Sequence, residues 1–123
     1  IRPSVKITYP WKLTLGDYAW VGDDAVLYTL GEITIGANSV VSQKCYLCTG
    51  SHDFMSQHFD ITASPIAIGE KCWLATDVFV APGVSVGDGT VIGARSSVFK
   101  SLPANKICRG NPAVVIRERV ETE

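Results

Sequence analysis

Two histidines, His52 and His58, are the side chains of this sequence best suited to acid–base chemistry near neutral pH, and the chain contains no others. Both belong to the segment SHDFMSQHFDITASP, residues 51–65, with His52 at its beginning and His58 further along. A histidine acts as a general base only if its ring is held in place. His52 is therefore the candidate base, because it lies next to ordered chain; the alternative is a solvated loop histidine. His58 has no assigned role.

Four cysteines, Cys45, Cys48, Cys72 and Cys108, offer a second kind of chemistry. Cys45 and Cys48 form a C-x-x-C pair, a spacing that can bind zinc or form a disulfide. The alternative is that the cysteines fill small positions of a repeat as reduced thiols, which pack like small apolar residues. A catalytic zinc held by three histidines cannot be built from two. We therefore expect no metal, and unpaired thiols indicate a reducing compartment, the cytoplasm.

The elements that must position these residues are predicted from an aliphatic residue at every sixth position, usually followed by glycine or alanine. In the clearest stretch these residues are Ile68, Leu74, Val80, Val86, Ile92 and Val98. A period of six fits neither a helix, with about 3.6 residues per turn, nor a strand, with about 2. Short strands alternating with turns produce it, and such coils stack into a β-solenoid. The slim residue four positions after each aliphatic one, such as Cys72 or Thr90, must also point into the narrow interior.

A recurring signature indicates triangular coils with one long insertion. It reads LTLG, ITIG, IAIG and VSVG, beginning at Leu13, Ile33, Ile66 and Val84. Ile66 and Val84 are 18 residues apart, which is three units of six and hence one coil with three sides. Ile33 and Ile66 are 33 apart, so fifteen extra residues leave the coil between them. Because the repeat resumes in register, they must form a loop that protrudes from one edge.

We expect one domain. Residues 1–103 should form the solenoid, with the inserted loop at about 51–65, and residues 104–123 a turn and a short helix that caps the open end. The helix is predicted at Pro112–Arg119, because proline suits the first turn of a helix. Ile1 and Ile7 already lie on the six-residue frame and the chain does not begin with Met, so we expect an N-terminal part of the full protein to be missing.

Charge and hydrophobicity argue against two classes of partner. The net charge of −1 provides no basic surface for nucleic acid or for an anionic membrane. The sequence has no run of about twenty apolar residues, the length needed to cross a bilayer. We expect neither nucleic-acid binding nor a membrane span.

The repeat and three further segments resemble a known family, the bacterial hexapeptide-repeat transferases. TGSHD at Thr49–Asp53, IAIGEKCW ending at Trp73 and VIGARSSVFK at Val91–Lys100 are similar to the branch that holds galactoside and maltose O-acetyltransferases. GSHD, WLATDVFVAPGVSVGDGTVIGARSSVFKSLP and RGNPAVVIRER resemble the colanic acid biosynthesis acetyltransferases. The resemblance implies an all-β, left-handed parallel β-helix with triangular coils, assembled as a homotrimer with active sites between subunits.

The same resemblance implies an acetyl-CoA-dependent O-acetyltransferase acting on a sugar or polysaccharide precursor. His52 matches the family's general base. Contacts to acetyl-CoA would fall on the residues that match the family's positions: Trp73, Thr76, Ala94, Lys100 and Arg117. Trp73 would line the region of acyl transfer, or alternatively fill a groove between subunits, and the two cations suit nucleotide phosphates.

The chemistry itself requires little from the protein. A thioester is already activated, so the enzyme must hold the acceptor hydroxyl near the acetyl carbon, remove its proton and stabilise the oxyanion. Two other functions stay open at this point. One is a non-catalytic trimeric scaffold, which would not bind CoA, and the other is an acetyltransferase for amino sugars or xenobiotics.

Overall fold

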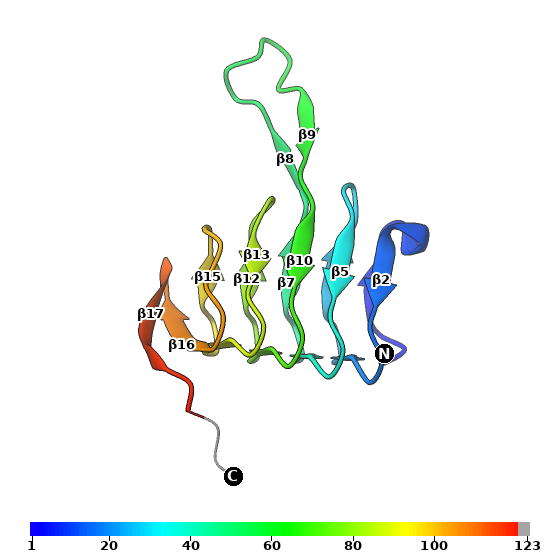
Figure 1. Ribbon diagram of the computed structural model, residues 1–123. Helices are drawn as coiled ribbons and strands as arrows, with labels where there is room; N and C mark the ends of the chain where they lie inside the picture. Colours follow the sequence, from blue (N-terminus) through cyan, green and yellow to red (C-terminus); the bar gives the residue numbers. More distant parts are fainter. Residues whose placement is uncertain (121–123) are drawn as a thin grey trace.

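The structure, a computed structural model, describes residues 1–120 as a solenoid with three faces and one projecting loop (Figure 1). Each coil contributes a short strand to each face, and strands of successive coils pair in parallel. Face A consists of β1 (Lys6–Ile7), β4 (Val26–Tyr28), β7 (Tyr46–Cys48), β12 (Phe79–Val80) and β15 (Ser97–Val98). Face B consists of β2 (Leu13–Leu15), β5 (Ile33–Ile35), β10 (Ile66–Ile68) and β13 (Ser85–Val86). Face C consists of β3 (Trp20–Val21), β6 (Val40–Val41), β11 (Trp73–Leu74), β14 (Val91–Ile92), β16 (Lys106–Gly110) and β17 (Ala113–Glu118).

The chain runs through faces B, C and A in each coil, so the solenoid has three rows of corners. We call them corner BC, corner CA and corner AB, after the faces that they join. A short 3-10 helix, η1 (Pro10–Lys12), lies between β1 and β2, directly before the first coil that passes through all three faces. The register agrees with the predicted coil length, since Ile68 pairs with Val86, eighteen residues later, and with Ile35 across the insertion. The predicted β-solenoid is confirmed.

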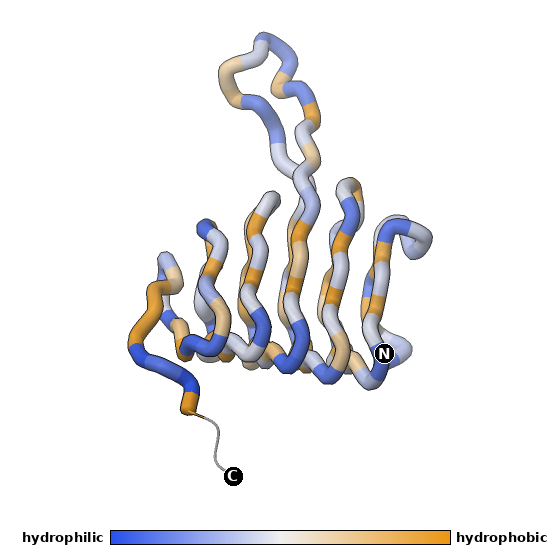
Figure 2. Tube along the Cα trace, viewed as in Figure 1, coloured by the Kyte–Doolittle hydropathy of each residue, from blue (hydrophilic) through white to orange (hydrophobic). Residues whose placement is uncertain are grey.

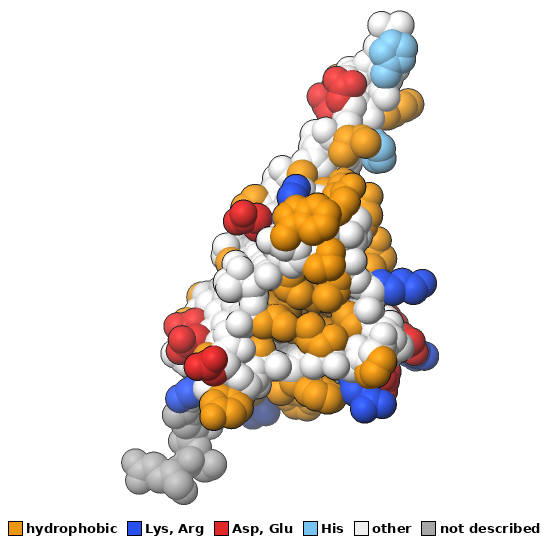
Figure 3. Space-filling view, turned by 90° about the vertical axis from the view of Figure 1, so that its right-hand side faces the viewer, with side chains coloured by type: hydrophobic (Ala, Val, Ile, Leu, Met, Phe, Trp, Pro, Cys, Tyr) orange, Lys and Arg blue, Asp and Glu red, His pale blue; other side chains and the backbone are white. Residues whose placement is uncertain are grey.

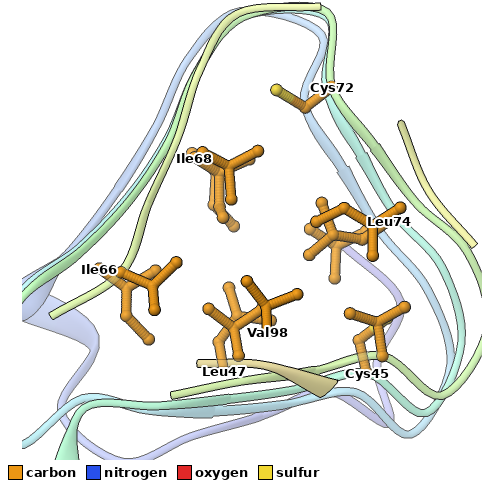
Figure 4. Close-up of a cluster of buried hydrophobic side chains, with 14 of the residues drawn as sticks. Cys45, Leu47, Ile66, Ile68, Cys72, Leu74 and Val98 are labelled. Carbon is orange, nitrogen blue, oxygen red and sulfur yellow. The ribbon is translucent and has the colours of Figure 1, made fainter. Parts of the chain in front are cut away.

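The aliphatic residues of the six-residue frame form the core. Figure 4 shows labelled side chains from all three faces, among them Ile68, Leu74 and Val98, pointing into the same triangular interior. These three are 0–2% exposed. Along the whole trace, apolar and polar positions alternate within each coil (Figure 2), as expected for strands with one buried and one solvated side. Burial of this continuous row of side chains holds the coils together.

The corners require residues that tolerate a tight turn and close neighbours. At corner CA, Asp24, Lys44, Asp77 and Arg95 all have φ of 60° to 62°, the left-handed conformation that bends the chain between two strands. Gly36, at corner BC, shows how closely the coils approach. A Cβ there would lie 2.6 Å from the carbonyl carbon and oxygen of Gly69 on the next coil. Glycine at this slot of the repeat is therefore a packing requirement.

All four cysteines are free, and three occupy the interior. Cys45 is 0% and Cys72 2% exposed, as predicted for slim inward positions. Cys108, which pairs with Ile92 on face C, is also 0% exposed. Burial raises the pKa of the Cys45 thiol to about 11. It also raises the pKa of the Cys72 and Cys108 thiols. The buried thiols are therefore neutral packing residues at physiological pH.

This shift predicts a loss of stability in base. The folded-state pKa of Cys45 lies above its ordinary value of 9.0, so the thiol favours folding below pH 9 and this contribution disappears as the pH rises to about 11. We expect Cys45→Ala to remove part of the decline in the free energy of unfolding over this range, on the order of 1–3 kcal/mol. Urea unfolding at a series of pH values measures it. Cys48→Ala, at a half-buried position, is the control. Equal declines in the wild type and Cys45→Ala would contradict the prediction.

The predicted C-terminal helix is wrong. Residues Ala113–Glu118 form strand β17, which pairs antiparallel with β16, and β16 itself continues face C by pairing with β14. Val114, Val115 and Ile116 are β-branched, which disfavours a helix and suits a strand. The hairpin still covers the last edge of face C, so the end of the solenoid is protected by a strand instead of a helix. Residues 121–123, the end of the predicted capping segment, lie outside the described residues.

Candidate active site

The insertion forms a hairpin that carries both histidines away from corner AB. Strands β8 (Gly50–His52) and β9 (Ile61–Ala63) pair antiparallel, with His52 opposite Ile61. Figure 3, a view along the solenoid, shows the hairpin rising from one corner with both histidines on it. The loop was predicted to protrude, and it does. His52 lies on its paired strand and His58 in the turn beyond.

The ring of His52 is held by a single contact that determines its chemistry. Nδ1 lies 2.8 Å from the carbonyl oxygen of Phe59, on the opposite arm of the hairpin. A carbonyl oxygen only accepts hydrogen bonds, so Nδ1 must carry the proton and donate it. In the neutral ring the lone pair is then on Nε2, which is free to accept a proton from a substrate. The contact thus fixes both the orientation and the tautomer that a general base needs.

A small pocket lies beside this ring. It has a volume of about 90 Å³ and is lined by Tyr28, Leu30, Gly50, Ser51, His52 and Ile61. Gly50 leaves it open, because a Cβ at this position would lie 2.6 Å from the tips of both Leu30 and Tyr28. The pocket is large enough for a few non-hydrogen atoms of a substrate adjacent to Nε2.

The structure brings four of the five predicted CoA-binding residues together on face C and corner CA. Thr76 and Ala94 occupy the same position of successive coils at corner CA, where the amide of Arg95 donates to the carbonyl of Thr76. Trp73 lies on face C just before this corner, half exposed, with Nε1 donating to Ser42 Oγ at 2.9 Å. Arg117 lies on the same row of face C, since its neighbour across β16–β17, Ile107, pairs with Val91, which pairs with Trp73.

Lys100 and His52 lie elsewhere. Lys100 follows β15 and is exposed at corner AB, the corner from which the hairpin of His52 departs. Face A separates this corner from corner CA, by about five extended residues or roughly 15 Å. The predicted site residues therefore form two groups, at the two edges of face A, and one chain does not unite them.

A second pocket, of about 540 Å³, lies at corner CA on the first two coils. Its lining combines an aromatic side chain with charged and polar groups. The residues are Trp20, the carboxylates Asp23 and Asp24, the cations Arg2 and Lys44, the amide Gln43, and Gly22. Arg2 Nε donates to Asp23 Oδ1 at 3.0 Å, which orients one side of the pocket. The pocket lies in line with Thr76 and Ala94. Gln43 is on the coil directly before Thr76, whose hydroxyl donates to the Gln43 carbonyl at 3.1 Å.

Several of these residues were not predicted from the sequence. Trp20 could have been found, because it occupies the outward position before Val21 on the same frame that places Trp73 before Leu74. The contact with the Phe59 carbonyl could not be predicted from the sequence. Every residue has a carbonyl group, and its direction depends on how the loop folds. The division between two corners was also readable in part. Thr76 and Ala94 are eighteen residues apart and must share a corner, whereas Lys100 comes six residues after Ala94 and belongs to the next one.

Neither a metal centre nor a bilayer-crossing element is found in the described part of the chain. Within residues 1–120, no three His, Cys, Asp or Glu side chains converge as ligands would. Over the same range, no helix reaches the length and apolar character that a membrane crossing demands.

We compared the sequence and the fold with those of known proteins. No family model matches the chain. Two solved structures superpose on it closely. A galactoside acetyltransferase in complex with coenzyme A gives a TM-score of 0.92 at 29% identity, over 98% of this chain and 62% of the other. A maltose O-acetyltransferase from Clostridium difficile 630 gives 0.91 at 28% identity, over 97% and 65%. The expected parallel β-helix of stacked coils is therefore confirmed, and because mirror-image coils do not superpose, the solenoid has the same hand as these enzymes.

The chain belongs to the hexapeptide-repeat acetyltransferases, in the branch of the galactoside and maltose O-acetyltransferases. Within this family it is similar to the Escherichia coli K12 protein named "Putative colanic acid biosynthesis acetyltransferase WcaF", with 87% identity over all 123 residues and 68% of that protein's length. The predicted family and enzyme class, acetyltransferase, are confirmed. The predicted cofactor agrees with the coenzyme A bound in the galactoside enzyme.

Proposed function

We propose that the protein transfers an acetyl group from acetyl-CoA to a hydroxyl group of a sugar or polysaccharide precursor, with His52 as the general base. The observation that carries this proposal is the bond from His52 Nδ1 to the Phe59 carbonyl, which leaves Nε2 unprotonated beside a small pocket. The names of the relatives, which act on galactosides and maltose or are assigned to colanic acid biosynthesis, support a carbohydrate acceptor.

Acetyl-CoA would lie along corner CA, parallel to the solenoid axis. The side chains at this corner are small. Leu74 is followed by Ala75 and Thr76, and Ile92 on the next coil is followed by Gly93 and Ala94. A flat surface of small side chains lets an extended pantetheine arm lie close to the backbone. Trp73 borders this path on face C, and Arg117, further toward the C-terminal end, is a cation suited to a phosphate.

The complete site would form between two copies of the chain in a homotrimer. If the three copies surround an axis parallel to the solenoid, with face A of each directed inward, corner AB of one copy meets corner CA of the next. His52 and Lys100 of one subunit would then face Trp73, Thr76 and Ala94 of its neighbour. This arrangement unites the two groups of residues that one chain keeps apart.

The side chains on the outside of face A support this orientation. Tyr46, Phe79 and Phe99 form a row in which neighbouring ring centroids are 6.0 Å apart. The outward residues of face B are small or polar, as in Thr34 and Ser85. A continuous row of partly exposed aromatic rings is typical of a surface that becomes buried on association.

The acceptor sugar would occupy the larger pocket at corner CA. The hairpin of His52 departs after β7, at the level of the second coil, and Gln43 and Lys44 lie at the same level of corner CA. The neighbour's His52 would thus lie between the acetyl-CoA path and the pocket that contains Trp20 and Asp23. An indole stacks on the apolar face of a sugar ring, and carboxylates accept hydrogen bonds from its hydroxyl groups.

The reaction then needs one proton transfer in each direction. His52 Nε2 removes the proton from the sugar hydroxyl as its oxygen forms a bond to the acetyl carbonyl carbon. The C–S bond of the tetrahedral intermediate breaks, and the sulfur leaves with the electron pair. The imidazolium returns the proton to this sulfur, which gives CoA-SH and the acetylated sugar. The neutral ring is restored without a covalent enzyme intermediate.

Acetyl-CoA turnover against a panel of sugars and sugar nucleotides tests the proposal. We expect a hydroxyl acceptor to be acetylated, and Trp20→Ala to raise its KM by roughly 10-fold through loss of stacking. The dissociation constant of CoA should not change. Trp11→Ala, which alters an exposed indole outside this pocket, is the matched control. Acetylation of amino groups only, or equal effects of the two substitutions, would contradict the assignment.

Compartment is a separate proposal. The four free cysteines support a reducing environment, and we propose the cytoplasm, where both acetyl-CoA and activated sugars are available as substrates.

A further inference from the structure

The turn of the hairpin contains a series of hydrogen bonds that begins at the ring of His52 and ends at the carbonyl of Asp53, the next residue. Ser56 is at its centre. The Ser56 hydroxyl accepts a hydrogen bond from the amide of Asp60 at 2.7 Å and donates one to the carbonyl of Asp53 at 2.9 Å. Asp53 directly follows His52, and its amide donates to the carbonyl of Asp60 at 2.8 Å. Ser56 therefore connects the two arms of the hairpin just beyond the histidine.

The bond between Ser56 and Asp60 acts on the peptide group that holds the histidine ring. The amide N–H of Asp60 and the carbonyl of Phe59 belong to one planar peptide unit and point in opposite directions. Ser56 Oγ binds the N–H end of this unit, and His52 Nδ1 binds its carbonyl end at 2.8 Å. Rotation of the peptide group would break both bonds together, so the hydroxyl restrains the acceptor of the histidine.

The backbone at this point needs such a restraint. Phe59 has φ of 50°, a left-handed conformation that side chains other than glycine, asparagine and aspartate rarely adopt. In this conformation the carbonyl of Phe59 lies 2.8 Å from Nδ1 of His52. The amide of Phe59 contributes only a long bond of 3.4 Å to the Ser56 carbonyl. The short bond from the Asp60 amide to the Ser56 hydroxyl is the stronger restraint.

We infer that Ser56 is a positioning residue for catalysis, which acts through the Phe59–Asp60 peptide group to keep His52 in the tautomer with the proton on Nδ1. The bonds run in one direction, from His52 Nδ1–H through the peptide group and the serine hydroxyl to the Asp53 carbonyl. Hydrogen bonds in such a series polarise one another, which makes the Phe59 oxygen a better acceptor for the Nδ1 proton. The inference rests on the proposed role of His52 and adds a residue that does not touch the substrate.

The test measures the ring directly and needs no substrate. Nitrogen-15 NMR of the full chain, labelled in histidine and carrying His58→Ala to leave one imidazole, reports which ring nitrogen is protonated. We expect the Nδ1–H form in the parent protein, a smaller fraction of it in Ser56→Ala, and full recovery in Ser56→Thr, which keeps a hydroxyl. Thr62→Ala, an exposed position on the same hairpin, should have no effect.

Turnover provides the second measurement. Ser56→Ala should lower kcat by about 10-fold with an unchanged KM for acetyl-CoA, because the ring is misplaced and the CoA path is intact. A parent protein with the proton on Nε2, or a Ser56→Ala protein with an unaltered tautomer, would overturn the inference. If the tautomer behaves as expected but no sugar is acetylated, the proposed function fails and the role of Ser56 in holding the ring stands. Should Ser56→Ala not fold, a parent protein with the proton on Nε2 would still overturn the inference.

Discussion

His52→Ala is expected to lower the rate of acetyl transfer by about 10²- to 10⁴-fold, the usual contribution of a general base. The substitution removes the ring nitrogen, Nε2, that the bond from Nδ1 to the Phe59 carbonyl leaves with a free lone pair. CoA binding and the fold should persist, because His52 is exposed and is not part of the buried core. Initial rates with saturating acetyl-CoA, together with circular dichroism, measure both properties.

The control lies in the same loop. His58→Ala removes a histidine from the turn of the hairpin, where no hydrogen bond to its ring is found among the described residues, and we expect near-normal rates. If His52→Ala retained most of the activity, or if His58→Ala removed as much, the assignment of the base would be wrong.

Ala94→Trp is expected to weaken CoA binding by roughly 100-fold or more, because an indole would occupy the path of the pantetheine arm at corner CA. Ala94 is exposed, so the larger side chain need not disturb the core. Ala104→Trp makes the same change at an exposed alanine of corner BC and should leave affinity unchanged. Isothermal titration with CoA measures both variants. Equal affinities would show that CoA does not use corner CA.

The two inactive variants also test whether the site is shared between subunits. A trimer refolded from equal amounts of His52→Ala and Ala94→Trp chains should contain about a quarter of sites with an intact histidine from one subunit and an intact corner from its neighbour. Activity should therefore return on mixing, although neither variant is active alone. If the site lay within one chain, every chain would carry one lesion and no activity would return.

The sequence predicted the coil well because every coil repeats the same pattern of buried and exposed positions. An aliphatic residue every sixth position must face the interior, and the slim residues between, such as Cys45 and Cys72, must share it. Each prediction was therefore supported by many equivalent positions. The C-terminal segment occurs once and has no such support. Pro112 at its start favoured a helix, but the unpaired edge of β16 offered the β-branched residues after it a strand to pair with.

The sequence by itself determined the triangular coil, the position of the insertion and the histidine that starts it, because these follow from spacing along the chain. Only the tertiary structure decided which atoms meet. In the folded chain the carbonyl of Phe59 accepts a hydrogen bond from Nδ1 of His52. Lys100 lies at one edge of face A and Ala94 at the other. The physical reason is that a periodic pattern specifies which way a side chain points within a coil, whereas the conformation of one irregular loop and the contacts across corners depend on single hydrogen bonds that no repeat encodes.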